Sequence, residues 1–242
     1  MSEPVLLVHD EGPVRVLRLN RPAKLNALDT ALTRALYDAL RAADGDTTVR
    51  AVVLAAEGRA FCAGADLSEF KDLTPANQQA VTERAALTTR TQMMLQQLRK
   101  PIVSVVQGAA VGGGAGLAIS CDMMVAADDL KFGYPELKHD IVPAIVMTGL
   151  QRQIGRKLAF EMISTGRLLN AAEAHEAGLA NRVTEPKSAL DAGLEIAVTW
   201  AAVSPQAMAA TKELFYRVAD LPFEEAMRTG RDINTIMRGF RG

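Results

Sequence analysis

Apolar residues along this chain follow two periods, one typical of strands and one typical of helices. Residues 5–8 and 14–19 are rich in β-forming residues and a turn signal separates them, so we expect the chain to begin with a hairpin. Leucines recur at helical spacing between residues 32 and 40, and Asp29 precedes them as a candidate helix cap. Strands and helices are thus both predicted within the first 45 residues.

The same two periods continue to residue 218. They predict strands at 52–54, 102–106, 125, 131–132 and 180–183, and helices at 78–98, 115–119, 158–163, 171–177, 189–202 and 205–218. Strands that feed helices dominate the earlier part, whereas Ala-rich helices prevail from about residue 147. We therefore expect an α/β core over residues 1–190 and a C-terminal helical region over 191–242.

Composition and charge exclude several classes of protein. The 242 residues are 49% hydrophobic and 23% charged, which is typical of a globular protein. The net charge is −1 and no basic block stands out, so we expect no nucleic-acid partner. Neither a signal segment at the start nor an apolar run of about 18 residues occurs. We therefore expect a cytoplasmic protein without membrane segments.

Cysteine and histidine usage argues against metal chemistry. Only Cys62 and Cys121 occur, and small or apolar neighbours favour buried packing for both. The three histidines are scattered and show no metal-ligand spacing. A metal-free mechanism is expected.

Two glycine-rich segments, 58–67 and 108–116, each follow a predicted strand. Small residues let a ligand approach the backbone closely, and a helix start after the second segment offers free N–H groups. Together the two segments can hold an oxyanion, although glycines also serve turns and tight packing. A dinucleotide fingerprint fails because Leu117 stands where a glycine is required, and no Gly-Lys-Ser/Thr follows for a phosphate loop.

These two segments, read with residues 21–28 and 132–136, resemble the crotonase family of enoyl-CoA hydratases and isomerases. The resemblance continues through 171–179 and covers residues from about 14 to 217. It implies an α/β fold, a crotonase-like spiral of repeated ββα units, with a helical C-terminal section that mediates formation of a homotrimer or hexamer.

The resemblance also implies the site. The backbone N–H groups of Ala65 and Gly113 would hold the oxygen of an acyl-CoA thioester while an enolate forms. CoA would be part of the substrate, and no separate cofactor is expected. Residues implied along the CoA path are Lys24, Leu25, Ala27, Ala63, Asp66 and Leu67. The acyl pocket would be shaped by residues 70–95 and by helices after 140.

The carboxylates decide which reaction is expected. Hydratases of this family use two glutamates, whose positions correspond to Gly116 and Glu136 here, so only one carboxylate remains. A single base suits isomerisation, in which one group removes and returns the same proton. Water addition and acyl-CoA binding without catalysis stay open as alternatives. Asp140 is either a replacement carboxylate or part of a solvated turn, and His139 is either an acid or base or simply exposed.

Overall fold

The computed structural model describes residues 3–71 and 73–238, and its larger sheet has six strands in the order β1-β2-β3-β4-β6-β9. These strands are β1 (Leu6–Glu11), β2 (Val14–Leu19), β3 (Ala51–Ala56), β4 (Ile102–Val106), β6 (Met123–Ala127) and β9 (Arg182–Thr184). Strands β1 and β2 form the predicted antiparallel hairpin, and each later pair of neighbours is parallel. Parallel neighbours require crossover connections, which the helices supply.

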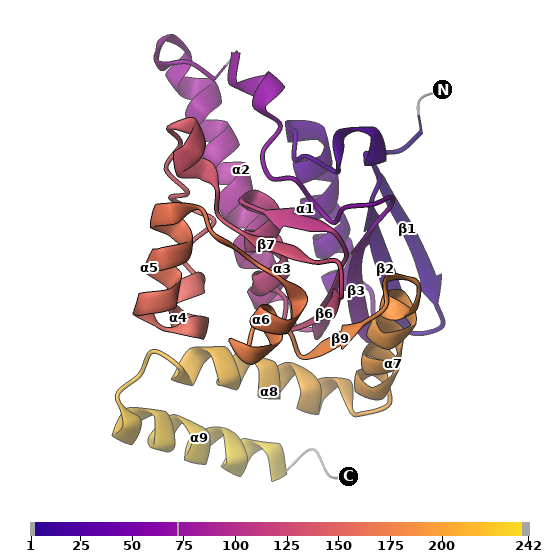
Figure 1. Cartoon of the computed structure of the whole chain (residues 1–242). Helices are drawn as coiled ribbons and strands as arrows, with labels where there is room; N and C mark the ends of the chain where they lie inside the picture. Colours follow the sequence, from indigo (N-terminus) through magenta and orange to yellow (C-terminus); the bar gives the residue numbers. More distant parts are fainter. Residues whose placement is uncertain (1–2, 72, 239–242) are drawn as a thin grey trace.

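Helices surround this sheet and continue beyond it (Figure 1). They are α1 (Thr30–Gly45), α2 (Gln78–Gln97), α3 (Gly113–Ser120), α4 (Leu150–Ile154), α5 (Arg156–Thr165), α6 (Ala171–Glu176), α7 (Ala189–Ala201), α8 (Pro205–Val218) and α9 (Phe223–Met237). The predicted cap of α1 is confirmed, because Asp29 Oδ1 accepts a hydrogen bond of 2.7 Å from the Leu32 N–H. Among the described residues, no helix is both long and apolar enough to cross a membrane.

Alternate residues of β3 face two different apolar clusters. Val52 and Leu54 join the cluster that α1 and α3 cover, whereas Val53 joins the cluster beneath α7. A strand buried on both faces reads as a continuous apolar run, which is why 52–54 was recognisable. Helix α7 approaches closely, since a Cβ at Gly193 would lie 2.4 Å from Val105 Cγ2.

A second, three-stranded sheet contains β5 (Ala109–Val111), β7 (Lys131–Gly133) and β8 (Leu168–Leu169). We predicted no strand within the glycine-rich segment 108–116, where the sequence indicates a turn, and this was wrong for β5. Short strands of small residues carry little periodicity, and β5 exists because β7 and Cys62 supply its hydrogen bonds. Because β5 ends at Val111, it fixes the place where α3 begins at Gly113.

The C-terminal helices form a hairpin at one end of the molecule (Figure 1). Helix α8 is fastened to the core by Lys212, whose Nζ lies 2.8 Å from Asp122 Oδ2 and also donates to two backbone carbonyls. Helix α9, which the sequence did not predict, packs against α8 and contains no buried residue. The domain boundary at residue 190 stays a prediction; α7, which spans it, packs on the sheet.

Candidate active site

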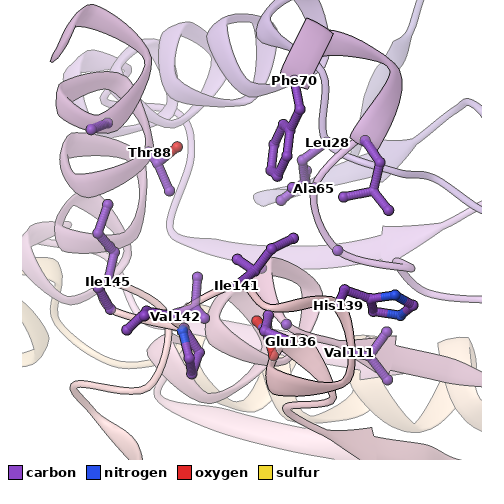
Figure 2. Close-up of a pocket in the computed structure, with 18 of the residues that line it drawn as sticks. Leu28, Ala65, Phe70, Thr88, Val111, Glu136, His139, Ile141, Val142 and Ile145 are labelled. Carbon is purple, nitrogen blue, oxygen red and sulfur yellow. The ribbon is translucent and has the colours of Figure 1, made fainter. Parts of the chain in front are cut away.

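A cavity of ≈ 580 Å³ opens beside the start of α3. Figure 2 shows Phe70 and Ile141 pointing toward one another across it, with Thr88 on α2 at one side. Its remaining walls are mostly apolar. They are formed by Leu28, residues 63–65, Leu67, Leu73, Val81, Arg84, Ala85, residues 111–113, Pro135, Glu136, His139 and residues 142–146. The wall after residue 140 is therefore the nonhelical segment before α4, whereas the sequence predicted helices there.

The two glycine-rich segments meet at this cavity. Cys62 pairs with Ala110 as a parallel bridge, which aligns the segments side by side. A Cβ at Gly64 would lie 3.7 Å from the Gly113 nitrogen, and one at Gly113 would lie 3.9 Å from the Ala65 nitrogen. The two backbone nitrogens named by the sequence are therefore neighbours on one cavity wall.

The N–H of Ala65 faces away from the strand-like segment beside it. Leu28 donates to the Gly64 carbonyl at 2.7 Å and accepts from the Asp66 N–H at 3.1 Å. In a parallel bridge of this pattern, the residue between those two partners directs its own N–H to the opposite side. Ala65, which lines the cavity, thus has a free donor there.

Gly113 is the first residue of α3, where backbone N–H groups have no partner within the helix. The helix is apolar and buried from Gly113 through Ile119, and its positive N-terminal end faces the cavity. Two adjacent N–H groups that have no hydrogen-bond partner among the described residues can stabilise negative charge on a carbonyl oxygen, each by about 3 kcal/mol once a bound substrate excludes water.

Glu136 is the carboxylate beside these donors. It begins a short 3₁₀ turn, η4 (Glu136–His139), and its Oε1 lies 2.5 Å from where a Cβ at Gly112 would stand. Its Oε2 is buried and has no hydrogen-bond partner among the described residues. Burial raises the pKa of Glu136, while a backbone hydrogen bond and His139 oppose the shift. Of the described residues that line the cavity, Glu136 alone is acidic.

The residues around Glu136 differ in their access to the cavity. His139 lines it but is exposed, and Asp140 is exposed without lining it. Asp140 has φ of 57°, a left-handed conformation that Asp tolerates, and it terminates η4. The solvated-turn interpretation of Asp140 therefore fits its position. Tyr134 is fully buried and packs edge-on against Phe132.

Of the six residues predicted along the CoA path, two line the cavity and four do not. Ala63 and Leu67 line the cavity, and the Ala63 N–H donates to the Leu25 carbonyl at 2.9 Å. Lys24 is exposed just before Leu25. Lys24, Leu25, Ala27 and Asp66 do not line the cavity, and their role along the CoA path stays a prediction.

Asp66 has structural partners in this structure. Its carboxylate accepts 2.6 Å and 2.9 Å hydrogen bonds from Ser68 and Arg21. The Ser68 hydroxyl, then Arg21, lowers the pKa of Asp66 to about 2. Asp66 therefore positions the loop that carries Ala65, and its role toward CoA stays a prediction.

Sequence reasoning did not assign roles to Asn26 and Arg84. Asn26 is fully buried, with φ of 53°, and its Nδ2 donates to the carbonyls of Glu57 and Ala60 at 2.8 Å each. It fixes residues 21–28 against the first glycine-rich segment. Arg84 lines the cavity, with its Nε 3.3 Å from Glu69. A single arginine within a helix does not indicate a role in the sequence. Asn26, in contrast, lies within residues 21–28, which resemble a family motif, and could have been predicted.

The arrangement lacks the features of a metal centre. Within the described parts of the chain, no group of three His, Cys, Asp or Glu side chains gathers to bind an ion. Cys62 and Cys121 are buried and unpaired, and burial raises the pKa of Cys62 to about 12. Both thiols are therefore packing groups, as their neighbours in the sequence predicted.

A family profile described as enoyl-CoA hydratase/isomerase matches residues 9–236. The chain belongs to the enoyl-CoA hydratase/isomerase family. The match extends beyond residues 14–217, the range over which motifs were recognisable. Helix α9 lies in the additional part and carries no recognisable motif. Membership of this family confirms the expected enoyl-CoA hydratase/isomerase type of enzyme and argues against a nucleotide-dependent oxidoreductase.

Relatives in the family cover nearly the whole chain. A probable enoyl-CoA hydratase of Rhizobium meliloti is 38% identical over 234 residues, which are 96% of this chain and 88% of that protein. The 2,3-dehydroadipyl-CoA hydratase of Escherichia coli is 35% identical, covering 98% and 91%. The crystal structure of an enoyl-CoA hydratase from Mycobacterium smegmatis superposes with a TM-score of 0.90 at 36% identity, covering 97% of this chain and 91% of that one. The α/β fold with its helical C-terminal part is therefore that of the crotonase enzymes.

Proposed function

We propose that this enzyme moves the double bond of an enoyl-CoA thioester, with Glu136 as the single base. The observation that carries the proposal is the carboxylate inventory of the cavity. Glu136 is the one acidic residue among the described residues of its wall, and Gly116 supplies no second carboxylate. One carboxylate can remove a proton from C2 and return it to C4.

The proposed sequence of events uses groups already described. The thioester oxygen accepts hydrogen bonds from the Ala65 and Gly113 N–H groups, so charge that leaves C2 accumulates on that oxygen. Glu136 takes the C2 proton, the double bond moves from C3–C4 to C2–C3, and the same proton passes to C4. A base whose pKa is raised by burial suits this task, because it holds the proton more firmly than a solvated carboxylate would before returning it.

The CoA portion is proposed to lie along the rim formed by Leu25, Ala27 and Ala63. Lys24 supplies an exposed positive charge suited to a phosphate. Asp66 and Leu67 then flank the entrance, with Leu67 on the cavity wall. The acyl chain extends toward the apolar wall of residues 141–146.

Water addition is the second candidate, and the names of the relatives favour it. The two reactions are separated by supplying 2-enoyl-CoA and 3-enoyl-CoA to the purified protein. Isomerisation produces conjugated absorbance from the 3-enoyl substrate. Water addition instead removes the absorbance of the 2-enoyl substrate. Loss of 2-enoyl absorbance without any conjugated product from 3-enoyl-CoA would contradict the proposal.

Glu136→Gln tests the base, with Glu176→Gln on the exposed side of α6 as a matched control. Removing the base should lower kcat by about 10²–10⁴-fold, and the control should leave it unchanged. Binding without catalysis, the remaining alternative, requires thioester binding without turnover in both the parent and Glu136→Gln.

We also propose that α9 is covered by further copies of this chain. Phe223, Met227 and Ile236 project from it with 81%, 61% and 61% of their surface exposed. Large apolar surfaces of this kind mark protein interfaces. Light scattering after size exclusion should give three or six times the 25.9 kDa of one chain, and a monomer at micromolar concentration would contradict the assignment.

A further inference from the structure

Gln92 lies where α2 contacts α3, and it lines a small space that adjoins the catalytic cavity without lining the cavity itself. It follows Thr88 by one turn on the same face of α2, and Thr88 lines the cavity. On the facing helix, Gly116 follows Gly113 by three residues and shares its face. The two helices thus bring Gln92 and Gly116 together one turn beyond the groups that hold the thioester.

The carboxamide of Gln92 occupies the space that a side chain at position 116 would fill. A Cβ at Gly116 would lie 2.7 Å from Gln92 Nε2 and 3.0 Å from its Oε1. Both distances are too short for a Cβ to be added without moving the amide. Gln92 can therefore adopt this position because Gly116 has no side chain.

The amide nitrogen has an unused hydrogen-bonding capacity. Gln92 Nε2 is buried without a partner among the described residues, as is Glu136 Oε2. Such groups are rare in folded proteins, because a buried donor or acceptor without a partner destabilises the fold. Leu28 and Thr88 line both the catalytic cavity and the small space of ≈ 10 Å³ beside Gln92. The amide therefore stands one layer of side chains from the reacting groups.

We propose that Gln92 selects proton transfer over water addition in this enzyme. The inference rests on the proposed function. Adding water across C2–C3 forms a bond from the water oxygen to C3, transfers one water proton to a base and places a proton on C2. Two carboxylates divide that work. Gln92 fills the place of the second one with a neutral amide, which cannot accept a proton at neutral pH.

The experiment compares Gln92→Glu with Gln96→Glu, which makes the same change one turn later on the exposed side of α2. Rates of hydration and of isomerisation are measured for the parent and both variants with 2-enoyl-CoA and 3-enoyl-CoA. Gln92→Glu should raise the ratio of hydration to isomerisation at least tenfold, whereas Gln96→Glu should leave it at the parent value. A purely structural role for Gln92 would lower both rates together.

A second variant guards against misfolding of Gln92→Glu. Gly116→Glu combined with Gln92→Ala places a carboxylate in the same space from the other helix, and it should shift the ratio in the same direction. An unchanged ratio in every folded variant would overturn the inference, even if the parent isomerises as proposed. A parent that only adds water would refute the proposed function and, with it, selection by Gln92, whereas an isomerising parent with an unchanged ratio in the variants would refute the role of Gln92 alone.

Discussion

Replacing Gly112 by alanine tests whether the position of the Glu136 carboxylate sets the rate. Gly112 lies between β5 and α3, with φ of 54°, and its N–H donates to the Gly133 carbonyl at 2.9 Å. A Cβ there would lie 2.5 Å from Glu136 Oε1, which is 0.9 Å closer than the 3.4 Å at which ordinary contacts begin. The carboxylate must therefore move by about that distance.

The size of the effect follows from this displacement. A misplacement of about 1 Å in a reacting group costs on the order of 10²-fold in rate. Alanine at a positive φ also costs roughly 1–3 kcal/mol of stability. Gly112→Ala should therefore lower kcat for the acyl-CoA reaction by about two orders of magnitude while the protein remains folded at 25 °C.

Gly178→Ala separates the two effects. Gly178 has φ of 79° and nothing within 4 Å of an added Cβ, so its substitution brings the strain without touching Glu136. Steady-state kinetics and thermal melts are measured on both variants. Similar melting temperatures with a loss of kcat only in Gly112→Ala are expected. Full activity of a folded Gly112→Ala would refute the assignment of Glu136 as the positioned base.

Three other predictions concern pH and stability. Because burial raises the pKa of Glu136 and the ionised form is the base, kcat/KM should rise with pH through a pKa above the usual value of about 4.3, and a flat profile between pH 4 and 8 would contradict this. The pKa of Asp66 is lowered to about 2 in the folded protein, whereas it is about 3.9 in an unfolded chain. Ionised Asp66 therefore stabilises the fold at pH values above about 3.9, and this stabilisation is lost as the pH falls toward 2. The melting temperature of Asp66→Asn should therefore lie below the parent's at pH 6, with a difference that shrinks between pH 4 and 2; a constant difference would count against the argument. Lys212→Met leaves the Asp122 carboxylate without its cation and should cost roughly 3–5 kcal/mol in urea unfolding, whereas a loss under 1 kcal/mol would show that α8 is held by other contacts.

The sequence predicted those elements whose apolar residues recur over several turns or fill a buried strand. The hairpin, α1 with its Asp29 cap, and the helices α2, α7 and α8 all have such patterns. Strand β5 and helix α4 were missed because each is short and depends on hydrogen bonds or packing from distant segments. Helix α9 was also missed, although its apolar residues recur on one face and the pattern was available in the sequence.

The sequence predicted the parts of the site whose backbone conformation requires particular residue types. Glycines and a Pro-Glu pair identified the region of Ala65, Gly113 and Glu136, because close approach and sharp turns require particular residues. Gln92 left no such trace. Its importance follows from contact with Gly116 across two helices, and no spacing along the chain encodes that contact.

The most direct test of the central claim is a crystal structure of the enzyme with a bound 3-oxoacyl-CoA. We expect the thioester oxygen at about 2.7–3.1 Å from both the Ala65 and Gly113 nitrogens, a range typical of oxyanion donors, with Glu136 beside C2. A thioester oxygen held by other groups, or a Glu136 carboxylate turned away from C2, would contradict it.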